Sequence, residues 1–233
     1  MTSREMTYDF KTKINKVDSQ TYRGLRVQEI DWALNAAEEI FIKMVAFPRF
    51  NTRLGFEKVQ RNTDDIRTIV VSSGDLTLVS NTVALPDDYW HYVGGTVLMT
   101  KQNCNATSGQ IKIRQHDDEF ESSPFDKSSF EWRTVNAVFD SAGLRFYTDG
   151  TFTIDTCNFD YVRRTAYIHN AQDTVGGTYN LPSGVVLAGF QNCELPEETH
   201  REIVDIAVLL VTGQMQIPDY QVKLSKLNLN NLN

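Results

Sequence analysis

Two hydrophobic periods divide the chain. Up to about residue 70, apolar side chains recur every three or four positions, which is the period of an amphipathic helix. From "SSGDLTLVSNTVAL" (residues 72–85), apolar and polar residues alternate between turn-forming Gly, Pro, Asn and Asp, as in β-strands. The helical period returns near residues 196–213. This order predicts an α+β fold in which N-terminal helices pack on an antiparallel β-sheet or sandwich, followed by a C-terminal helix and an extended C-terminal arm.

The helical part contains three predicted helices. "TSRE" (residues 2–5) has the spacing of a capping box, in which a hydroxyl and a carboxylate satisfy free backbone N–H groups at a helix start. A second helix covers residues 25–45, and a third, weaker one covers residues 53–70. The second helix has an apolar face opposite Glu29, Glu39 and Lys43, and that face consists of Val27, Ile30, Leu34, Ala37, Phe41 and Met44.

The following region contains short strand candidates separated by turns. They include "GQIKIRQH", "TVNAVFD", "GLRFYTDG", "TFTIDTCNF" and "DYVRRTAYI", and the loops "DSAG" and "TDGT" have turn chemistry. We therefore expect a helical part at residues 1–72, a β-rich body with the C-terminal helix at residues 73–216, and an extended arm at residues 217–233.

Composition and charge restrict the function. The 233 residues are 41% hydrophobic and 23% charged, which is ordinary for a globular protein, and no apolar run is long enough for a signal peptide or a membrane span. Three widely spaced cysteines argue against a disulfide framework. We expect a soluble protein made in a cytoplasm. The net charge of −7 argues against tight nucleic-acid binding, which needs clustered cations.

The segments with the most reactive side chains predict no catalytic site. In "CELPEETHREIVDIAVLLVTG" (residues 193–213), His200 falls on the apolar face of a helix and the acids fall on the other side, so no zinc-binding pair forms. "LPDDYW" (residues 85–90) indicates a turn into a strand, and "QHDDEFE" (residues 115–121) lacks the spacing of a calcium loop. We predict no catalytic, metal-binding or cofactor-binding residues.

Other residues are candidates for contacts with a partner protein. Trp32 lies on the polar side of its helix, where it either packs against the β region or anchors an interface. Arg163 and Arg164, adjacent in a predicted strand, must project to opposite faces. In the arm, "VKLSKLNLNNLN" alternates apolar and polar residues and is expected to add to a sheet of its own or a neighbouring subunit. The arm candidates are Tyr220, Lys223, Leu224, Leu227 and Leu229.

The order of several short sequences resembles one protein family. "REMTYDF", "EIDWALNAAEEIF", "LPDDYWHYV", "YVRRTAYI" and "CELPEETHREIVDIAV" are similar to head-to-tail connector proteins (ring, adaptor or neck proteins) of short-tailed, crAss-like bacteriophages. The resemblance spans nearly the whole chain. It implies a virion protein of the neck that forms a cyclic ring of about twelve copies, contacts the portal protein and neighbouring ring or tail proteins, and lets DNA pass without sequence-specific binding.

The sequence is also compatible with two other functions. Tyr89, Trp90, Tyr92 and Trp132 can supply stacking platforms for sugars, which makes a carbohydrate-binding module of a virion or surface the main alternative. A hydrolase would need two of the scattered carboxyl groups about 5–9 Å apart across a cleft.

Overall fold

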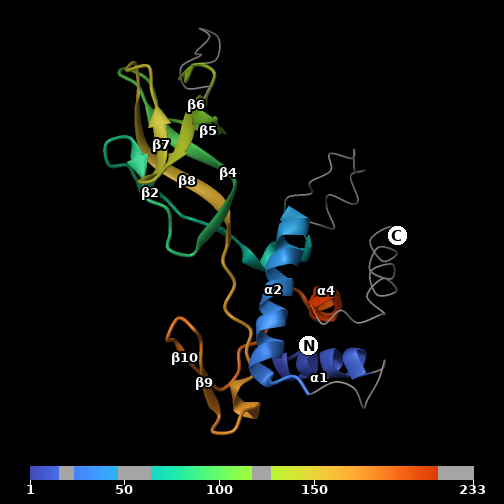
Figure 1. The fold of residues 1–233 in the computed structure, drawn as a ribbon. Coiled ribbons are helices and arrows are strands. Elements are labelled where there is room, and N and C mark those ends of the chain that lie inside the picture. Colours follow the sequence, from blue (N-terminus) through green and yellow to red (C-terminus); the bar gives the residue numbers. More distant parts are fainter. Residues whose placement is uncertain (16–23, 47–63, 117–126, 215–233) are drawn as a thin grey trace, which may run out of the picture. The chain divides into compact units, whose positions relative to one another are not determined.

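The computed structural model describes residues 1–15, 24–46, 64–116 and 127–214 (Figure 1). The chain divides into two compact units, a helical unit of residues 1–69 and 165–233 and a β unit of residues 70–164. The α+β prediction is confirmed. The predicted boundaries at residues 72 and 216 differ from these units, because the segment after residue 164 packs with the N-terminal helices.

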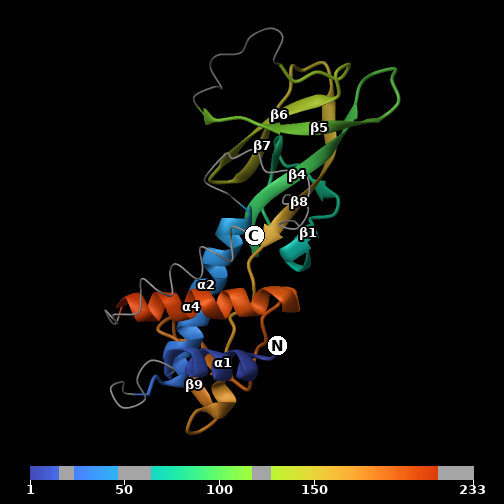
Figure 2. The ribbon, with the colours of Figure 1, turned by 90° about the vertical axis from the view of Figure 1, so that its right-hand side faces the viewer.

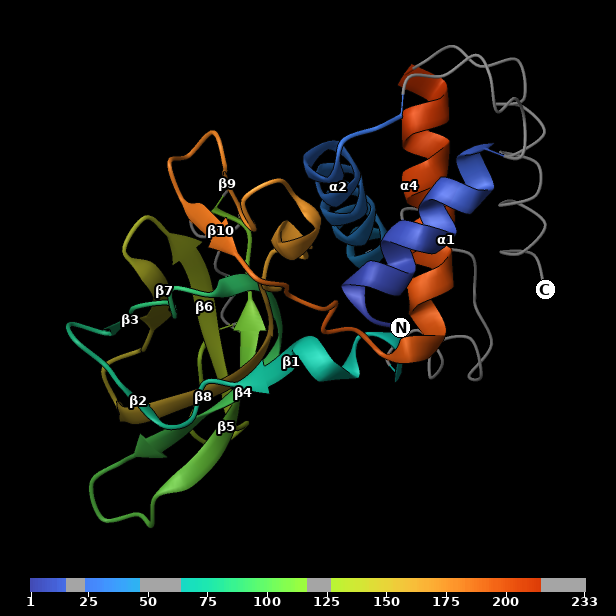
Figure 3. The ribbon, with the colours of Figure 1, turned by 90° about the horizontal axis from the view of Figure 1, so that it is seen from below.

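Among the described residues of the helical unit, the core is formed by the helices α1 (Ser3–Asn15), α2 (Val27–Ala46) and α4 (His200–Gln214). Figures 2 and 3 show α1 and α2 both lying against α4. The predicted capping box is present at α1, where the Thr2 N–H donates to Glu5 Oε2 over 2.8 Å and the Glu5 N–H donates to Thr2 Oγ1 over 3.3 Å. Lys13 joins α1 to α4 through Asp205, 2.8 Å away.

The segment between Thr165 and α4 completes the helical unit. It contains a 3-10 helix (Ala171–Asp173), the two-stranded hairpin of β9 (Thr178–Asn180) and β10 (Val186–Ala188), and a second 3-10 helix (Glu197–Thr199). The C-terminal helix was predicted at residues 196–213, and α4 confirms it with a 3-10 turn in front.

The β unit is one curled, mostly antiparallel sheet. Among the described residues its strands follow the order β1-β8-β4-β5-β6-β7-β3, with β2 also paired to β8, and β5–β6 is a parallel pair. The strands are β1 (Val70–Ser72), β2 (Leu76–Thr77), β3 (Thr82–Val83), β4 (Tyr89–Thr100), β5 (Thr107–Ile113), β6 (Thr134–Asp140), β7 (Gly143–Tyr147) and β8 (Thr153–Arg163).

Two predicted elements differ from the structure. "TFTIDTCNF" and "DYVRRTAYI" were separate strand candidates, but β8 is continuous across them and ends at Arg163, because residues 165–168 bond to α2 instead. Of the predicted helix at residues 53–70, the part before residue 64 lies outside the described residues. The remainder does not continue as one helix, since residues 67–69 form a 3-10 turn and β1 begins at Val70.

Bulges in β4 place aromatic side chains on the core face of the sheet. Strict alternation would send Tyr89 and Tyr92 to opposite faces. The pairing with β8 shifts register between Tyr89 and His91, and an extra residue in one strand changes which face the next side chains occupy. Both tyrosines therefore pack against Phe139 and Phe159, with ring centroids 5.9–6.4 Å apart.

Candidate interaction site

Polar side chains interrupt the apolar face of α2 and hold the segment that follows β8. Asp31, Asn35 and Glu38 are spaced four and three residues apart, so they share one side of the helix. Asn35 pairs with the backbone of Ile168: its Nδ2 donates to the carbonyl oxygen over 2.7 Å, and its Oδ1 accepts from the N–H over 2.8 Å. The sequence prediction gave α2 an apolar buried face and missed these contacts.

Asp31 is fully buried and anchors the hairpin end of this segment. Its Oδ2 accepts hydrogen bonds from the Asn170 N–H at 3.0 Å and the Tyr179 hydroxyl at 2.8 Å. Burial raises the pKa of Asp31, and these two hydrogen bonds oppose that shift. The carboxyl group thus fixes the position of Tyr179 on β9 against α2.

Glu38, only 2% exposed, anchors the other end. Its Oε2 accepts from the Thr165 hydroxyl over 2.9 Å, and the Cys193 thiol lies 3.3 Å from its Oε1. Burial, with a smaller contribution from nearby Glu194, raises the pKa of Glu38 to about 7. Burial together with Glu38 also raises the pKa of the Cys193 thiol, so this cysteine is not an activated nucleophile.

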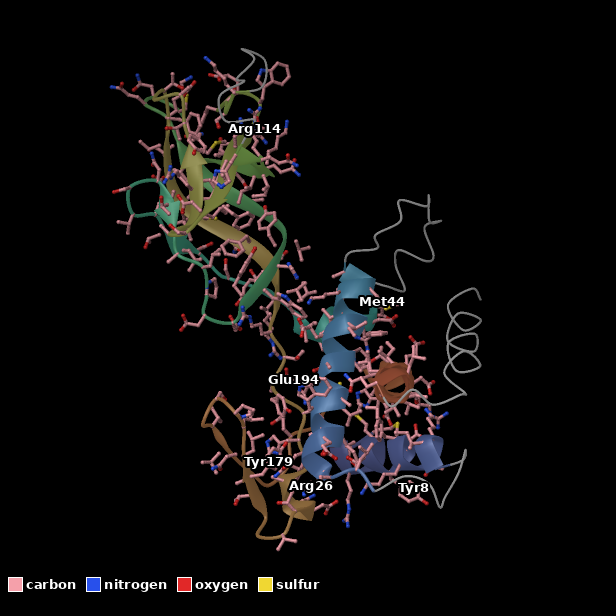
Figure 4. The ribbon with its side chains drawn as sticks, in the orientation of Figure 1. Tyr8, Arg26, Met44, Arg114, Tyr179 and Glu194 are labelled. Carbon is pink, nitrogen blue, oxygen red and sulfur yellow. The ribbon has the colours of Figure 1, made fainter. Side chains whose placement is uncertain are left out.

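The segment held in this way forms one wall of a pocket of about 480 Å³. Trp32 of α2 lies on another wall, and Figure 4 shows Tyr179 beside the end of α2 at which Arg26 lies. The described lining residues are mainly apolar or aromatic, and they are Leu25, Gln28, Glu29, Trp32, Tyr167, Tyr179, Asn180, Leu181, Pro182, Val211 and Gln214. All of them belong to the helical unit.

The hairpin that contributes to the pocket also exposes apolar side chains. We define the hairpin surface as Val175, Val185, Val186 and Phe190, all exposed, with Phe190 57% exposed. These side chains gain no burial energy while they face water, and they would gain it where a partner protein covers them. Together with Trp32, which is 53% exposed, they make the hairpin side of the helical unit the candidate interaction site.

The other predicted interface residues lie at the end of β8 or in the C-terminal arm. Arg163 ends β8, and Arg164 is exposed just beyond the strand. Tyr167 belongs to the predicted strand "DYVRRTAYI", but it lies after the end of β8 and lines the pocket near Trp32. Tyr220, Lys223, Leu224, Leu227 and Leu229 lie outside the described residues.

The segments with reactive side chains have structural contacts. His200 is buried and its Nε2 lies 2.8 Å from the Leu195 carbonyl oxygen, and Asp88 accepts from the Tyr161 hydroxyl at 2.8 Å. In the part of the chain that the structure describes, no three His, Cys, Asp or Glu side chains gather as a metal site would require.

The sequence matches no protein-family model and no curated protein. Among the described helices, none has an apolar stretch of the length needed to cross a bilayer.

Proposed function

We propose that this protein is a structural virion protein that forms a ring at the portal vertex, connects head and tail, and lines the DNA channel. The observation that carries the proposal is the exposed apolar surface around Trp32 and the hairpin. A ring forms when one face of each subunit docks on a different face of the next, and the centre of such a contact is usually apolar.

Charge and sequence resemblance support the same function. The chain has a net charge of −7, and an acidic channel wall repels phosphates, so DNA passes without being held. The motifs similar to crAss-like connector proteins are distributed over both units, so the resemblance does not depend on one domain.

Negative-stain imaging of the protein mixed with the portal protein of the same phage tests this proposal. We expect a collar of added density with the rotational symmetry of the portal, which neither protein gives alone. The double variant Val186→Asp, Phe190→Asp should lose the collar, because it places charge on the hairpin surface. Val79→Asp is the matched control, since Val79 is exposed in the β unit. No association of the wild-type protein at any salt concentration would contradict contact with the portal.

Carbohydrate binding by the β unit is the second candidate function. Trp132, which is 82% exposed, is the observation that favours it, whereas Tyr89 and Tyr92 pack in the core. Glycan-array binding that is lost in Trp132→Ala would support this function in place of the connector.

A further inference from the structure

The pocket beside Trp32 combines aromatic rings with an absence of cations among its described lining residues. Trp32, Tyr167 and Tyr179 contribute the rings, and Glu29 is the charged residue among the described lining positions. The face of an aromatic ring carries negative electrostatic potential and attracts a cation placed over it.

Two carboxyl groups, those of Asp31 and Glu29, lie near these rings. The buried Asp31 carboxyl accepts the hydrogen bond of the Tyr179 hydroxyl over 2.8 Å. Desolvation and then Asp31 raise the pKa values of both Tyr167 and Tyr179, so both rings stay neutral. Glu29 lies on the exposed side of the pocket.

The start of α2 lines the pocket with the positive end of its helix dipole, and Glu29 offsets it, because Glu29 Oε2 accepts from the Arg26 N–H at 2.8 Å. The last described turn of α4, with Val211 and Gln214, also lines the pocket and contributes no basic side chain.

We propose that this pocket binds an arginine side chain presented by a peptide segment of a partner protein. A guanidinium group is planar and stacks on aromatic faces, and its aliphatic stem fits beside Leu25, Leu181 and Val211. A pocket of about 480 Å³ also has room for the peptide backbone next to the arginine. This inference goes beyond the ring proposal, because it holds for any partner that presents the arginine.

Three short peptides distinguish recognition of the charge of arginine from recognition of its shape. We expect the full-length protein to bind acetyl-Gly-Arg-Gly-amide about tenfold more tightly than the same peptide with citrulline, whose side chain has the shape of arginine without its charge. The readout is NMR titration of the Trp32 indole N–H, assigned with Trp32→Phe. Equal binding of the arginine and citrulline peptides, or tighter binding of a leucine peptide, would overturn the proposal.

Variants then locate the binding. Glu29→Gln removes the charge while glutamine can still accept the capping hydrogen bond from Arg26. It should weaken binding of the arginine peptide about three- to tenfold and leave the affinity for the citrulline peptide unchanged. Trp32→Ala should abolish binding, and Trp132→Ala, which removes an exposed tryptophan of the β unit, should not alter it. Arginine binding unchanged in both Glu29→Gln and Trp32→Ala would also refute it.

The outcome is independent of ring assembly. Arginine binding can be measured on the protein without the portal, so a failed collar experiment with normal arginine binding would reject only the connector function. A normal collar without arginine binding would reject only this pocket.

Discussion

At the scale of single residues, Glu38 places an ionisable group inside the buried face of α2. Its pKa of about 7 in the fold lies above the ordinary value of 4.5, so the folded state binds the proton more tightly than the unfolded chain. The stability contributed by the protonated form is present below about pH 4.5 and is lost as pH rises to about 7. Thr165, Cys193 and Glu194 are the neighbours that face it.

We predict that Glu38→Gln removes this part of the pH dependence. When the pH rises from 4.5 to 7.5, the free energy of unfolding of the wild type should decrease. This decrease should exceed that of the variant by about 2–3 kcal/mol. Urea denaturation at several pH values measures the difference. Glu39→Gln is the control, since Glu39 is exposed one position along and pairs with Lys43. Parallel pH profiles for the wild type and Glu38→Gln would contradict the burial argument.

Asp31 and Tyr179 give a second prediction at this scale. Tyr179→Phe removes one hydrogen bond and should cost about 1 kcal/mol. Asp31→Ala leaves the Tyr179 hydroxyl and the Asn170 N–H buried without this acceptor, and it should cost about 3 kcal/mol or more. Chemical denaturation of both variants and of the double variant gives the coupling. An Asp31→Ala variant as stable as Tyr179→Phe would show that the carboxyl does not hold the hairpin.

Which residues of α2 are buried was only partly predictable from the sequence. The hydrophobic period found most of the apolar face of α2, because burial and a 3.6-residue repeat go together. It missed Asp31 and Glu38, since a periodicity argument assigns acids to the solvent. Their spacing with Asn35, in step with the apolar stripe, was the available signal, but their partners come from residues 165–193 and pair only after folding.

At the scale of elements, β4 and β8 form the longest pair of the sheet, and two adjacent glycines in β4 meet different surroundings. A Cβ atom at Gly95 would lie 2.6 Å from Phe159 Cβ and 2.8 Å from the Asn158 carbonyl oxygen, whereas one at Gly94 meets nothing within 4 Å. Close approach to backbone cannot be relieved by a rotamer change.

We therefore predict that Gly95→Ala destabilises the protein by about 2–3 kcal/mol and that Gly94→Ala changes stability by less than about 0.5 kcal/mol. Thermal or urea unfolding of the two variants provides the comparison. Similar stabilities would contradict the close packing of β4 on β8 at this position.

The sequence predicted whether most segments form helices, strands or turns, but it did not predict where some of these elements end. The turn "DSAG" was predicted from its composition, and Asp140 Oδ1 accepts from the Ala142 and Gly143 N–H groups as such a turn requires. The end of β8 depends on bonds from Thr165 and Ile168 to α2, so no local pattern in "DYVRRTAYI" could place Tyr167 in a pocket beside Trp32.

At the scale of the whole molecule, the fold class followed from the sequence, but the grouping of elements did not. The C-terminal helix was assigned with the β body because it follows the strands along the chain. It belongs instead to the helical unit, where Ile203, Val204 and Ala207 are buried and Asp205 pairs with Lys13 of α1. Which faces meet over long sequence separations is decided by tertiary packing.

The C-terminal arm gives a prediction at this scale. If the arm reaches a neighbouring subunit, deletion of residues 219–233 should abolish ring assembly on the portal and leave the unfolding transition of the isolated protein unchanged. Substituting Leu224, Leu227 and Leu229 by Ser is a milder version of the same test. Normal assembly after deletion would remove the arm from the proposed ring contacts.

The most direct test of the connector function is a cryo-electron microscopy reconstruction of the portal vertex in intact virions. The proposal predicts a closed ring below the portal whose subunits fit the helical unit and the curled β unit separately, around a channel filled by DNA. A vertex whose density is fully explained by other chains, with this protein absent, would contradict it.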